Sequence, residues 1–277
     1  IISVGRIAGL EINGERRIPA EAVILAIGHS ARDTFRMLLS RQVPMEAKAF
    51  AVGVRIQHPQ EMIDESQYGK EAAAILGPAS YKLTHQCANG RGVYSFCMCP
   101  GGLVVNASSE PGRLAVNGMS YHARDGKNAN SALIVTVKPE DFGGEGPLAG
   151  VSFQQRLEEK AYELGQGKIP VQLYGDFREG RISGDFGDVT PAFAGSTEFA
   201  DLNQILPDPV SESLKEGIES FGQKIPGFSR PDAVLAAVES RTSSPVRINR
   251  DEHMESAVKG LFPCGEGAGY AGGITSA

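Results

Sequence analysis

The sequence predicts a mixed α/β fold in which both ends of the chain build one domain and the middle builds a β-rich insert. A strand pattern and a helix pattern alternate near the N-terminus, and a strand followed by a glycine-rich turn ends the chain. Short apolar runs separated by Gly, Pro, Asn and Ser fill the centre. We therefore expect an α/β domain from residues 1–45 and 241–277, interrupted by an α+β, β-rich domain over residues 46–240.

The first segment combines a hairpin, a strand and a helix. Asn13 and Gly14 lie between two strand-like runs, and both residue types tolerate the positive φ angles of a tight hairpin turn. The apolar run AVILAIG, residues 22–28, predicts a strand that is buried on both faces. Ser30 is then expected to cap a helix over residues 31–42.

The middle of the chain has fewer helix signals. A strand pattern over residues 49–58 precedes a helix that Pro59 opens, and apolar residues recur at helical spacing over 151–165. The remaining predicted segments are short antiparallel strands between residues 81 and 137, a long loop over 175–200, helices over 211–223 and 231–240, and, after a short helix, a strand over 260–265.

The composition predicts a globular protein and disfavours two kinds of partner. Of the 277 residues, 41% are hydrophobic and 22% are charged, which suits a chain with a packed core. The formal net charge of −6 disfavours a nucleic acid or an anionic membrane as partner. No apolar run of the sequence is long enough to span a bilayer. Because the chain lacks an initiating Met, we expect it to begin inside a longer protein.

Cysteine and histidine usage predicts neither a disulfide framework nor a metal site. The four cysteines are Cys87, Cys97, Cys99 and Cys264, and their spacing is not that of zinc ligands. We interpret them as reduced, buried thiols, which are typical of a cytoplasmic protein. The five histidines are scattered without metal-ligand spacing, so we expect no bound metal.

The C-terminal turn carries the motif on which the functional prediction depends. Gly267, Gly269 and Gly272 form G-x-G-x-x-G, which opens a dinucleotide-binding fold when an acidic residue follows about twenty positions later. Here an acidic residue, Glu266, directly follows the strand. Its carboxylate can accept hydrogen bonds from sugar or ribityl hydroxyls, and a helix starting near Gly272 would direct its N–H groups at the same ligand. The alternative is a glycine-rich turn that holds no ligand.

Several stretches together resemble one known family. AVILAIGHSARDTF resembles the internal strand motif of flavoproteins with two dinucleotide-binding folds, and GLFPCGEGAGYAGGITSA resembles their closing motif, with Glu266 where many members carry Asp. With FAVGVRIQHPQ, YSFCMCPGG, NGMS and ESRTSSPVRINRD, the pattern is similar to that of bacterial FAD-dependent dehydrogenases, a largely uncharacterised family of oxidoreductases. The resemblance extends over nearly the whole chain, which looks like the C-terminal part of such a protein.

This resemblance implies a partial FAD/NAD(P)-binding Rossmann-like domain that is interrupted by a β-rich substrate domain. It also implies a missing partner, the N-terminal half of the FAD domain that holds the pyrophosphate, so we expect this chain alone to be inactive. The residues expected to contact FAD are Ala26, Gly28, His29, Gly265, Glu266, Gly267, Gly269, Gly272, Gly273 and Ile274.

Candidate catalytic and substrate-binding residues come from two further stretches. An arginine near a flavin can stabilise negative charge, which makes Arg241 and Arg247 catalytic candidates, although surface arginines are the alternative. Cys99 is a third candidate if its thiol is reactive, and a buried apolar cysteine otherwise. The stretch NGMS is first of all a predicted hairpin turn and secondly a substrate-facing segment. The residues expected to contact substrate are Arg241, Thr242, Ser243, Ser244, Asn117 and Met119.

The resemblance implies an FAD-dependent oxidoreductase that transfers hydride or electrons to or from an unidentified small molecule, with NAD(P)H as a candidate electron donor. Two alternatives stay open at this point. The terminal motif could open the nucleotide fold of an NAD(P)-dependent enzyme. The β-rich insert could instead be a non-enzymatic module that binds a ligand or a partner.

Overall fold

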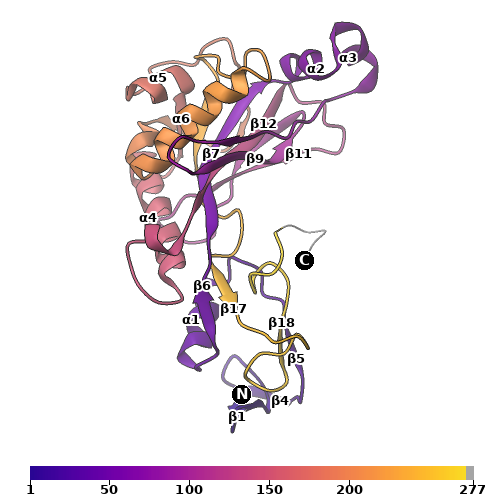
Figure 1. The fold of residues 1–277 in the computed structure, drawn as a ribbon, viewed down its shortest axis with the longest axis vertical. Helices are drawn as coiled ribbons and strands as arrows, with labels where there is room; N and C mark the ends of the chain where they lie inside the picture. Colours follow the sequence, from indigo (N-terminus) through magenta and orange to yellow (C-terminus); the bar gives the residue numbers. More distant parts are fainter. Residues whose placement is uncertain (273–277) are drawn as a thin grey trace. The chain divides into compact units, whose positions relative to one another are not determined.

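The computed structural model describes residues 1–272, which divide into two compact units (Figure 1). The first unit contains residues 1–50, 137–154 and those from 241 onward, and the second contains residues 51–136 and 155–240. The sequence places residues 137–154 in the β-rich domain, whereas the structure packs them with the two ends of the chain. The reason is apolar packing, because Val151 joins the same hydrophobic core as Phe35.

The first unit is built from short strands and helical segments around this core. Its elements are β1 (Ile2–Ser3), β2 (Arg6–Ile7), β3 (Gly9–Ile12), β4 (Arg16–Pro19), β5 (Val23–Leu25), α1 (Arg32–Ser40), β6 (Met45–Ala47), a short 3-10 helix (Pro139–Asp141), the start of α4 (Ala149–Leu164), β17 (Val246–Ile248) and β18 (Leu261–Pro263). Antiparallel pairing joins β1 to β2, β3 to β4 and β6 to β17, and parallel pairing joins β5 to β18. A Rossmann-like sheet has several parallel strands, and residues 1–272 of this unit show one parallel pair, so the Rossmann-like assignment stays a prediction.

The predicted hairpin is confirmed, and the prediction for the strand after it is wrong in one respect. Asn13 and Gly14 connect β3 to β4 with φ angles of 52° and 73°. In β5, by contrast, Ile24 is 74% exposed. Val23 and Leu25 on the other face are partly buried against the core, so the described residues cover only one face of the strand.

Two helix predictions in this unit need correction. Helix α1 begins at Arg32, with Ala31 at its N-cap and no capping side chain, so Ser30 does not cap it. No helix forms in the described backbone between β17 and β18. There the Asp251 carboxylate accepts hydrogen bonds from the N–H groups of His253 and Glu255 at 2.9 and 3.1 Å, which favours a turn over a helix.

The second unit centres on a mixed seven-stranded sheet with the strand order β15-β13-β16-β7-β12-β9-β8. Figure 1 shows α5 and α6 on one side of this sheet, and a smaller sheet, β11-β10-β14, contains the remaining strands. The elements are β7 (Phe50–Pro59), α2 (Gln60–Tyr68), α3 (Lys70–Leu76), β8 (Thr84–Gln86), β9 (Gly92–Cys99), β10 (Gly102–Asn106), β11 (Val116–Ser120), β12 (Asn128–Val137), β13 (Ile169–Leu173), α5 (Tyr174–Glu179), β14 (Phe193–Ala194), β15 (Thr197–Phe199), a 3-10 helix (Leu202–Gln204), α6 (Asp208–Gly222) and β16 (Val234–Glu239).

The helix predicted over residues 231–240 is wrong, since this segment forms β16. All six residues of β16 are buried, and the strand pairs with β7 on one side and β13 on the other. A continuous apolar run gives no periodicity that separates a buried strand from a buried helix. The long loop predicted over 175–200 is also interrupted, by the end of α5 and by β14 and β15.

The turn predicted at Asn117 and Gly118 is wrong as well, because both residues lie inside β11 and pair with β10. Gly118 has a packing role there. A Cβ at this position would lie within 2.9 Å of the guanidinium carbon of Arg55, so the strand can cross that side chain only without one. Glycine is required at position 118 because the Arg55 guanidinium lies close to the backbone there, and not because the chain turns.

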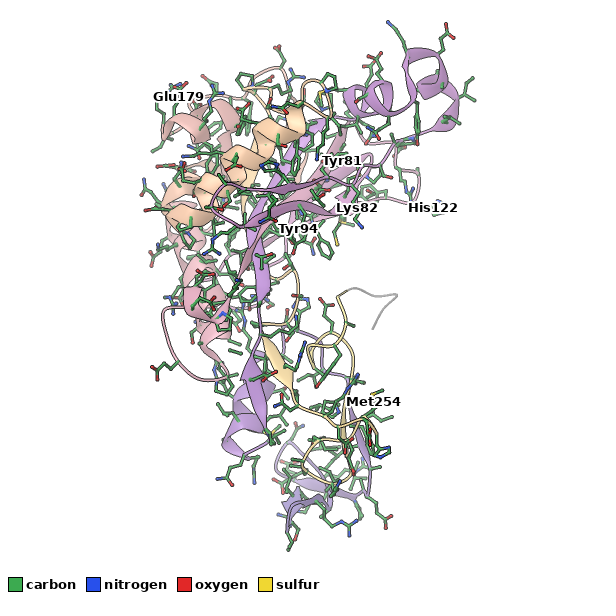
Figure 2. The ribbon with its side chains drawn as sticks, viewed as in Figure 1. Tyr81, Lys82, Tyr94, His122, Glu179 and Met254 are labelled. Carbon is green, nitrogen blue, oxygen red and sulfur yellow. The ribbon has the colours of Figure 1, made fainter. Side chains whose placement is uncertain are left out.

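The core of the second unit is closed by aromatic side chains. The hydroxyl of Tyr81, labelled in Figure 2, lies 2.8 Å from Ser131 Oγ, and its ring meets Phe228 edge-on. Phe221 of α6 meets Phe228 in the same way. No helix within the described part of the chain combines the length and the apolar character needed to cross a lipid bilayer.

Candidate functional site

The two ends of the described chain meet at one edge of the β5–β18 pair. The strands run parallel, with Leu25 opposite Pro263 at their carboxyl ends. The pairing continues beyond them, because Cys264 N–H donates to the carbonyl oxygen of Leu25 at 3.1 Å. In open parallel sheets, ligands bind outside the carboxyl ends of the strands. The segments that follow β5 and β18 therefore leave the sheet at the edge where a ligand is expected.

Direct backbone contact joins the two turns at this edge. Gly267 is buried against Gly28, so that a Cβ at position 267 would lie 2.6 Å from the carbonyl carbon and 2.8 Å from the nitrogen of Gly28. Gly269 is buried in a similar way, and a Cβ there would lie 2.6 Å from the carbonyl oxygen of Val246. Glycine at 267 and 269 therefore allows protein segments to pack together. That these two residues also contact FAD stays a prediction.

Other predicted contact residues remain accessible. A Cβ at Gly28 or Gly272 would have no atom within 4 Å, and Ala26 is exposed. Gly28 and Gly265 both have φ angles of 71°, which glycine adopts without steric cost. The remaining two predicted FAD contacts, at positions 273 and 274, lie outside the described residues.

Glu266 and His29 face each other across the two turns. Glu266 Oε1 lies 4.0 Å from His29 Nε2, and the two side chains are about a quarter exposed, at 21% and 25%. Burial lowers the pKa of His29 below its usual value, the Glu266 carboxylate opposes this, and Arg241 and Arg32 add to the lowering. His29 is therefore mostly neutral at pH 7 and can form hydrogen bonds without adding charge.

Lys48 carries a positive charge close to both Arg247 and Glu266. Burial lowers the pKa of Lys48, the Arg247 guanidinium adds to this, and Glu266 opposes it. Arg241 Nη1 donates to Ser30 Oγ at 3.5 Å. The buried Nε of Arg247 has no hydrogen-bond acceptor among residues 1–272. An unused buried donor within a group of cations suits an anionic ligand.

The segment that carries the predicted substrate contacts is anchored to this turn. Ser244 is buried, and its Oγ lies 2.9 Å from the carbonyl oxygen of Val246 and 3.1 Å from that of Gly267. Ser244 thus holds the glycine turn in place and is not available to a substrate, which corrects the prediction. Thr242 is also buried, whereas Arg241 and Ser243 are partly accessible.

The remaining candidates, in the second unit, gather around Arg55. This side chain is fully buried and donates from Nε to Glu239 Oε2 at 2.7 Å. Its Nη2 donates to Asn117 Oδ1 at 2.7 Å, and its Nη1 lies 3.9 Å from Cys99 Sγ. Asn117 therefore holds an internal charge in place, whereas Met119, in the same strand, is 41% exposed.

The environment of Cys99 does not activate its thiol. Burial raises the pKa of Cys99, and the neighbouring Arg55 guanidinium opposes this rise only in part. A reactive thiolate needs the opposite shift. The four cysteines are thiols and not disulfides, but of the four only Cys87 is buried, while Cys97 is exposed. The expectation of buried thiols is thus wrong for three of them.

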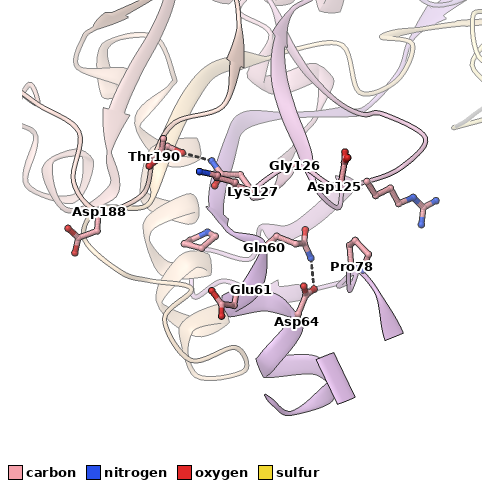
Figure 3. Close-up of a pocket in the computed structure, with 12 residues that line it drawn as sticks. Gln60, Glu61, Asp64, Pro78, Asp125, Gly126, Lys127, Asp188 and Thr190 are labelled. Atoms are coloured by element: carbon pink, nitrogen blue, oxygen red, sulfur yellow. Dashed lines mark hydrogen bonds between the residues drawn. The ribbon is translucent and has the colours of Figure 1, made fainter. Parts of the chain in front are cut away.

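The second unit contains two cavities, the first of which is lined by Cys99. One, of about 500 Å³, is lined by Met98, Cys99, Pro100, Ser120, Tyr121, His122 and Arg124. The other, of about 460 Å³, lies at the N-terminus of α2 and is shown in Figure 3. There Gln60 donates to Asp64 Oδ1 at 2.6 Å and to the carbonyl oxygen of Ala79 at 3.0 Å, and it accepts from Gly101 N–H at 2.7 Å, so its amide already joins α2 to two other segments.

Comparison with known proteins assigns the chain to a family. Residues 49–242 match the family described as FAD-dependent protein, C-terminal domain-like. The chain belongs to this family. It is also 56% identical, over 99% of its length, to an uncharacterized protein of Clostridium beijerinckii, and it spans 52% of that relative's length. Membership of an FAD-dependent family confirms the resemblance at the level of a flavoprotein-related domain.

The match to the FAD-dependent family covers the whole second unit and, of the first unit, residues 49–50, 137–154, 241 and 242. Gly28 and Glu266 lie outside the matched residues. A role for these two turns in binding flavin is therefore still a prediction, which depends on their geometry and on their motifs.

Sequence reasoning missed Lys48, Arg55 and Tyr270. Arg55 is the one Asp, Glu, Lys or Arg residue in the largely apolar strand β7, and a lone charge in such a run signals a buried ion pair. Tyr270 packs under the guanidinium of Arg250, with 3.8 Å between Cζ and the ring centroid, and Arg250 donates to the carbonyl of Pro263 at 2.8 Å. No sequence signal distinguishes Lys48 from other surface lysines.

Proposed function

We propose that the chain forms part of an FAD-dependent oxidoreductase and that its first unit holds the flavin nucleotide at the carboxyl ends of β5 and β18. The observation that carries the proposal is the backbone contact between Gly267 and Gly28. Through this contact, the accessible backbone of Gly28 and the carboxylate of Glu266 lie at one edge of a parallel strand pair. Family membership favours FAD over other nucleotides.

The residues at this edge fit a flavin nucleotide in three respects. The carboxylate of Glu266 can accept hydrogen bonds from ribityl or ribose hydroxyls. Gly28 leaves its side of the turn open, so backbone atoms can approach a flat ring closely. The unpartnered Nε of Arg247 and the ammonium group of Lys48 offer positive charge to the anionic groups of the nucleotide.

When bound, FAD would supply the hydride or electron transfer. The chain's own residues would bind the nucleotide and orient it. Glu266 would position hydroxyl groups, while Arg241 and Arg247 would favour negative charge on the ligand or on a small-molecule substrate. A neutral His29 would add a hydrogen bond without adding charge, because burial lowers its pKa.

Further parts of the protein would complete the site. The chain spans 52% of the length of its Clostridium relative. In this proposal, the additional segment supplies the turn that binds the pyrophosphate. It also covers the exposed face of β5 that carries Ile24, since parallel sheets are normally covered on both faces. NAD(P)H would be a candidate electron donor for the completed enzyme.

Purification of the full-length protein tests the proposal. We expect bound flavin, seen as its visible absorbance, in the wild-type protein. Replacement of Gly267 by Ala should weaken FAD binding by at least about 10-fold, because the added methyl group separates the two turns. Gly144→Ala, in the same unit and with open space around its Cβ, is the matched control and should bind FAD like wild type.

A second variant keeps this test valid if Gly267→Ala does not fold. Glu266→Gln preserves the shape of the side chain and should fold normally while losing FAD affinity. The proposal is wrong if the well-folded wild-type protein neither contains nor binds FAD, or if Glu266→Gln and Gly267→Ala bind it as tightly as Gly144→Ala.

A further inference from the structure

A histidine, a cysteine and a glutamate meet at the outer edge of the seven-stranded sheet. His85 lies in the edge strand β8, Cys87 directly follows that strand, and Glu216 lies on α6. One ligand atom from each residue, Nε2, Sγ and a carboxylate oxygen, lies within 4.8 Å of the others. Since 131 residues separate His85 from Glu216, the fold and not the local sequence creates this group.

The local structure holds these side chains in one place. His85 and Cys87 are two residues apart in extended backbone, so their side chains lie on the same face. Gly217, next to Glu216, lets α6 approach the sheet, because a Cβ there would lie 2.7 Å from Val93 Cγ1. The group is therefore built by close packing of a helix on a strand.

Hydrogen bonds orient two of the three donors. The N–H of Ala88 donates to both oxygens of Glu216, at 3.0 and 3.2 Å, and Glu216 Oε1 lies 2.9 Å from His85 Nε2. The thiol of Cys87 lies 3.6 Å from the carbonyl oxygen of Ser213. Hydrogen bonds from groups outside the ligand set, such as those from Ala88 N–H to Glu216, position the ligands of metal ions in proteins.

We propose that His85, Cys87 and Glu216 form a zinc site. Thiolate, imidazole and carboxylate together form a donor set that zinc prefers, and in a tetrahedral site with bonds of about 2.0–2.3 Å the ligand atoms lie roughly 3.5 Å apart. The His85 and Glu216 atoms, at 2.9 Å, are already closer than this, so only the longer separations, of up to 4.8 Å, need to shorten by about 1 Å. The ion would take the place of the hydrogen between His85 and Glu216, since a neutral His85 that binds through Nε2 carries its one proton on Nδ1, and the Cys87 thiol would release its proton to solvent.

The site would be open on one side. Cys87 is 4% exposed, whereas the side chains of His85 and Glu216 are 25% and 40% exposed. Three protein ligands leave a fourth position, which water would occupy on the exposed side. One thiolate and one carboxylate would neutralise the ion. Because all three residues lie in the second unit, this proposal is independent of the flavin site.

Titration of the metal-free protein with Co²⁺ and Zn²⁺ tests the inference. Wild type should bind one Zn²⁺ at this site, and Co²⁺ should produce the near-ultraviolet absorption of a cobalt–thiolate bond. Cys87→Ser should lose that absorption. His85→Gln and Glu216→Gln should each weaken Zn²⁺ affinity by more than about 10-fold, since even loss of an outer-shell partner has an effect of this size.

The matched control is Cys97→Ser, which removes an exposed thiol of the same unit and should leave Zn²⁺ affinity and the cobalt spectrum unchanged. Glu216→Gln provides the readout if Cys87→Ser fails to fold, because its partly exposed side chain can be replaced without opening a cavity. The inference is overturned if Co²⁺ gives no thiolate absorption, if Cys97→Ser removes it, or if His85→Gln and Glu216→Gln bind Zn²⁺ as tightly as wild type.

Discussion

Acid should destabilise the second unit through His58. This side chain is fully buried, and its Nε2 lies 2.7 Å from the carbonyl oxygen of Phe228, so Nε2–H donates to that oxygen. The other ring nitrogen, Nδ1, is buried without a partner among the residues that the structure describes. The ring also packs on that of Phe228, with 4.4 Å between the centroids. Protonation of Nδ1 would therefore place a charge where no acceptor exists.

The size of the effect follows from the pKa of His58. Burial lowers this pKa from 6.5 to about 4, while the carbonyl of Phe228 and Asp232 oppose the lowering and Arg230 adds to it. The folded protein thus binds this proton less readily than the unfolded chain. The stability contributed by a neutral His58 is complete above pH 6.5 and is lost as the pH falls from 6.5 toward 4. At about 1.4 kcal/mol per pKa unit, the loss is about 2 kcal/mol at pH 5 and about 3 kcal/mol below pH 4.

Urea unfolding at pH 7 and pH 5 measures this loss. Other groups also titrate in this range, so the relevant quantity is the difference between wild type and His58→Phe, which cannot be protonated. The variant should lose about 2 kcal/mol less than wild type between the two pH values. His122→Gln, which removes an exposed histidine labelled in Figure 2, should behave like wild type. Equal losses in wild type and His58→Phe would refute the reasoning.

Two further predictions concern the stability of the same unit, measured as the free energy of unfolding in urea. Glu239→Gln leaves the buried charge of Arg55 without its counter-ion and should cost about 3–5 kcal/mol, whereas Glu198→Gln breaks an exposed ion pair and should cost less than about 1 kcal/mol. Similar costs for both variants would contradict the role of Glu239 as the buried counter-ion of Arg55. Gly53→Ala places a methyl group against the carbonyl of the neighbouring strand β12 and should cost at least about 2 kcal/mol. Gly184→Ala, which places its methyl group in open space, should leave the free energy of unfolding unchanged. Equal stability of the two alanine variants would exclude close packing at position 53.

The sequence predicted the feature that matters most for the candidate site. The apolar run ending at Gly28 and the strand followed by Glu266 suggested that both chain ends share one sheet, and the structure pairs them as β5 and β18. The local sequence was sufficient here because each apolar run ends at a glycine, which marks the end of the strand. The occupant of the site stays a prediction, because the glycines and Glu266 define a shape and a charge but not a particular ligand.

Tertiary packing explains the main errors. Residues 231–240 form a central strand because β7 and β13 pair with its two edges and all six residues of β16 are buried, and an alanine-rich run carries no sign of this. Gly118 was interpreted as a turn residue, although its missing side chain makes room for Arg55. Likewise, Glu216 joins His85 and Cys87 only once α6 packs on β8. In each case, the deciding neighbour lies far away in the sequence.

Hydrogen–deuterium exchange of the full-length protein, with and without FAD, tests the central claim most directly. The account predicts that FAD slows exchange in both turns, at residues 26–30 and 264–270, while the distant hairpin turn at Asn13 and Gly14 exchanges as before. Binding of FAD without slower exchange in these two turns, or slower exchange in one turn only, would contradict a site formed by the two chain ends together.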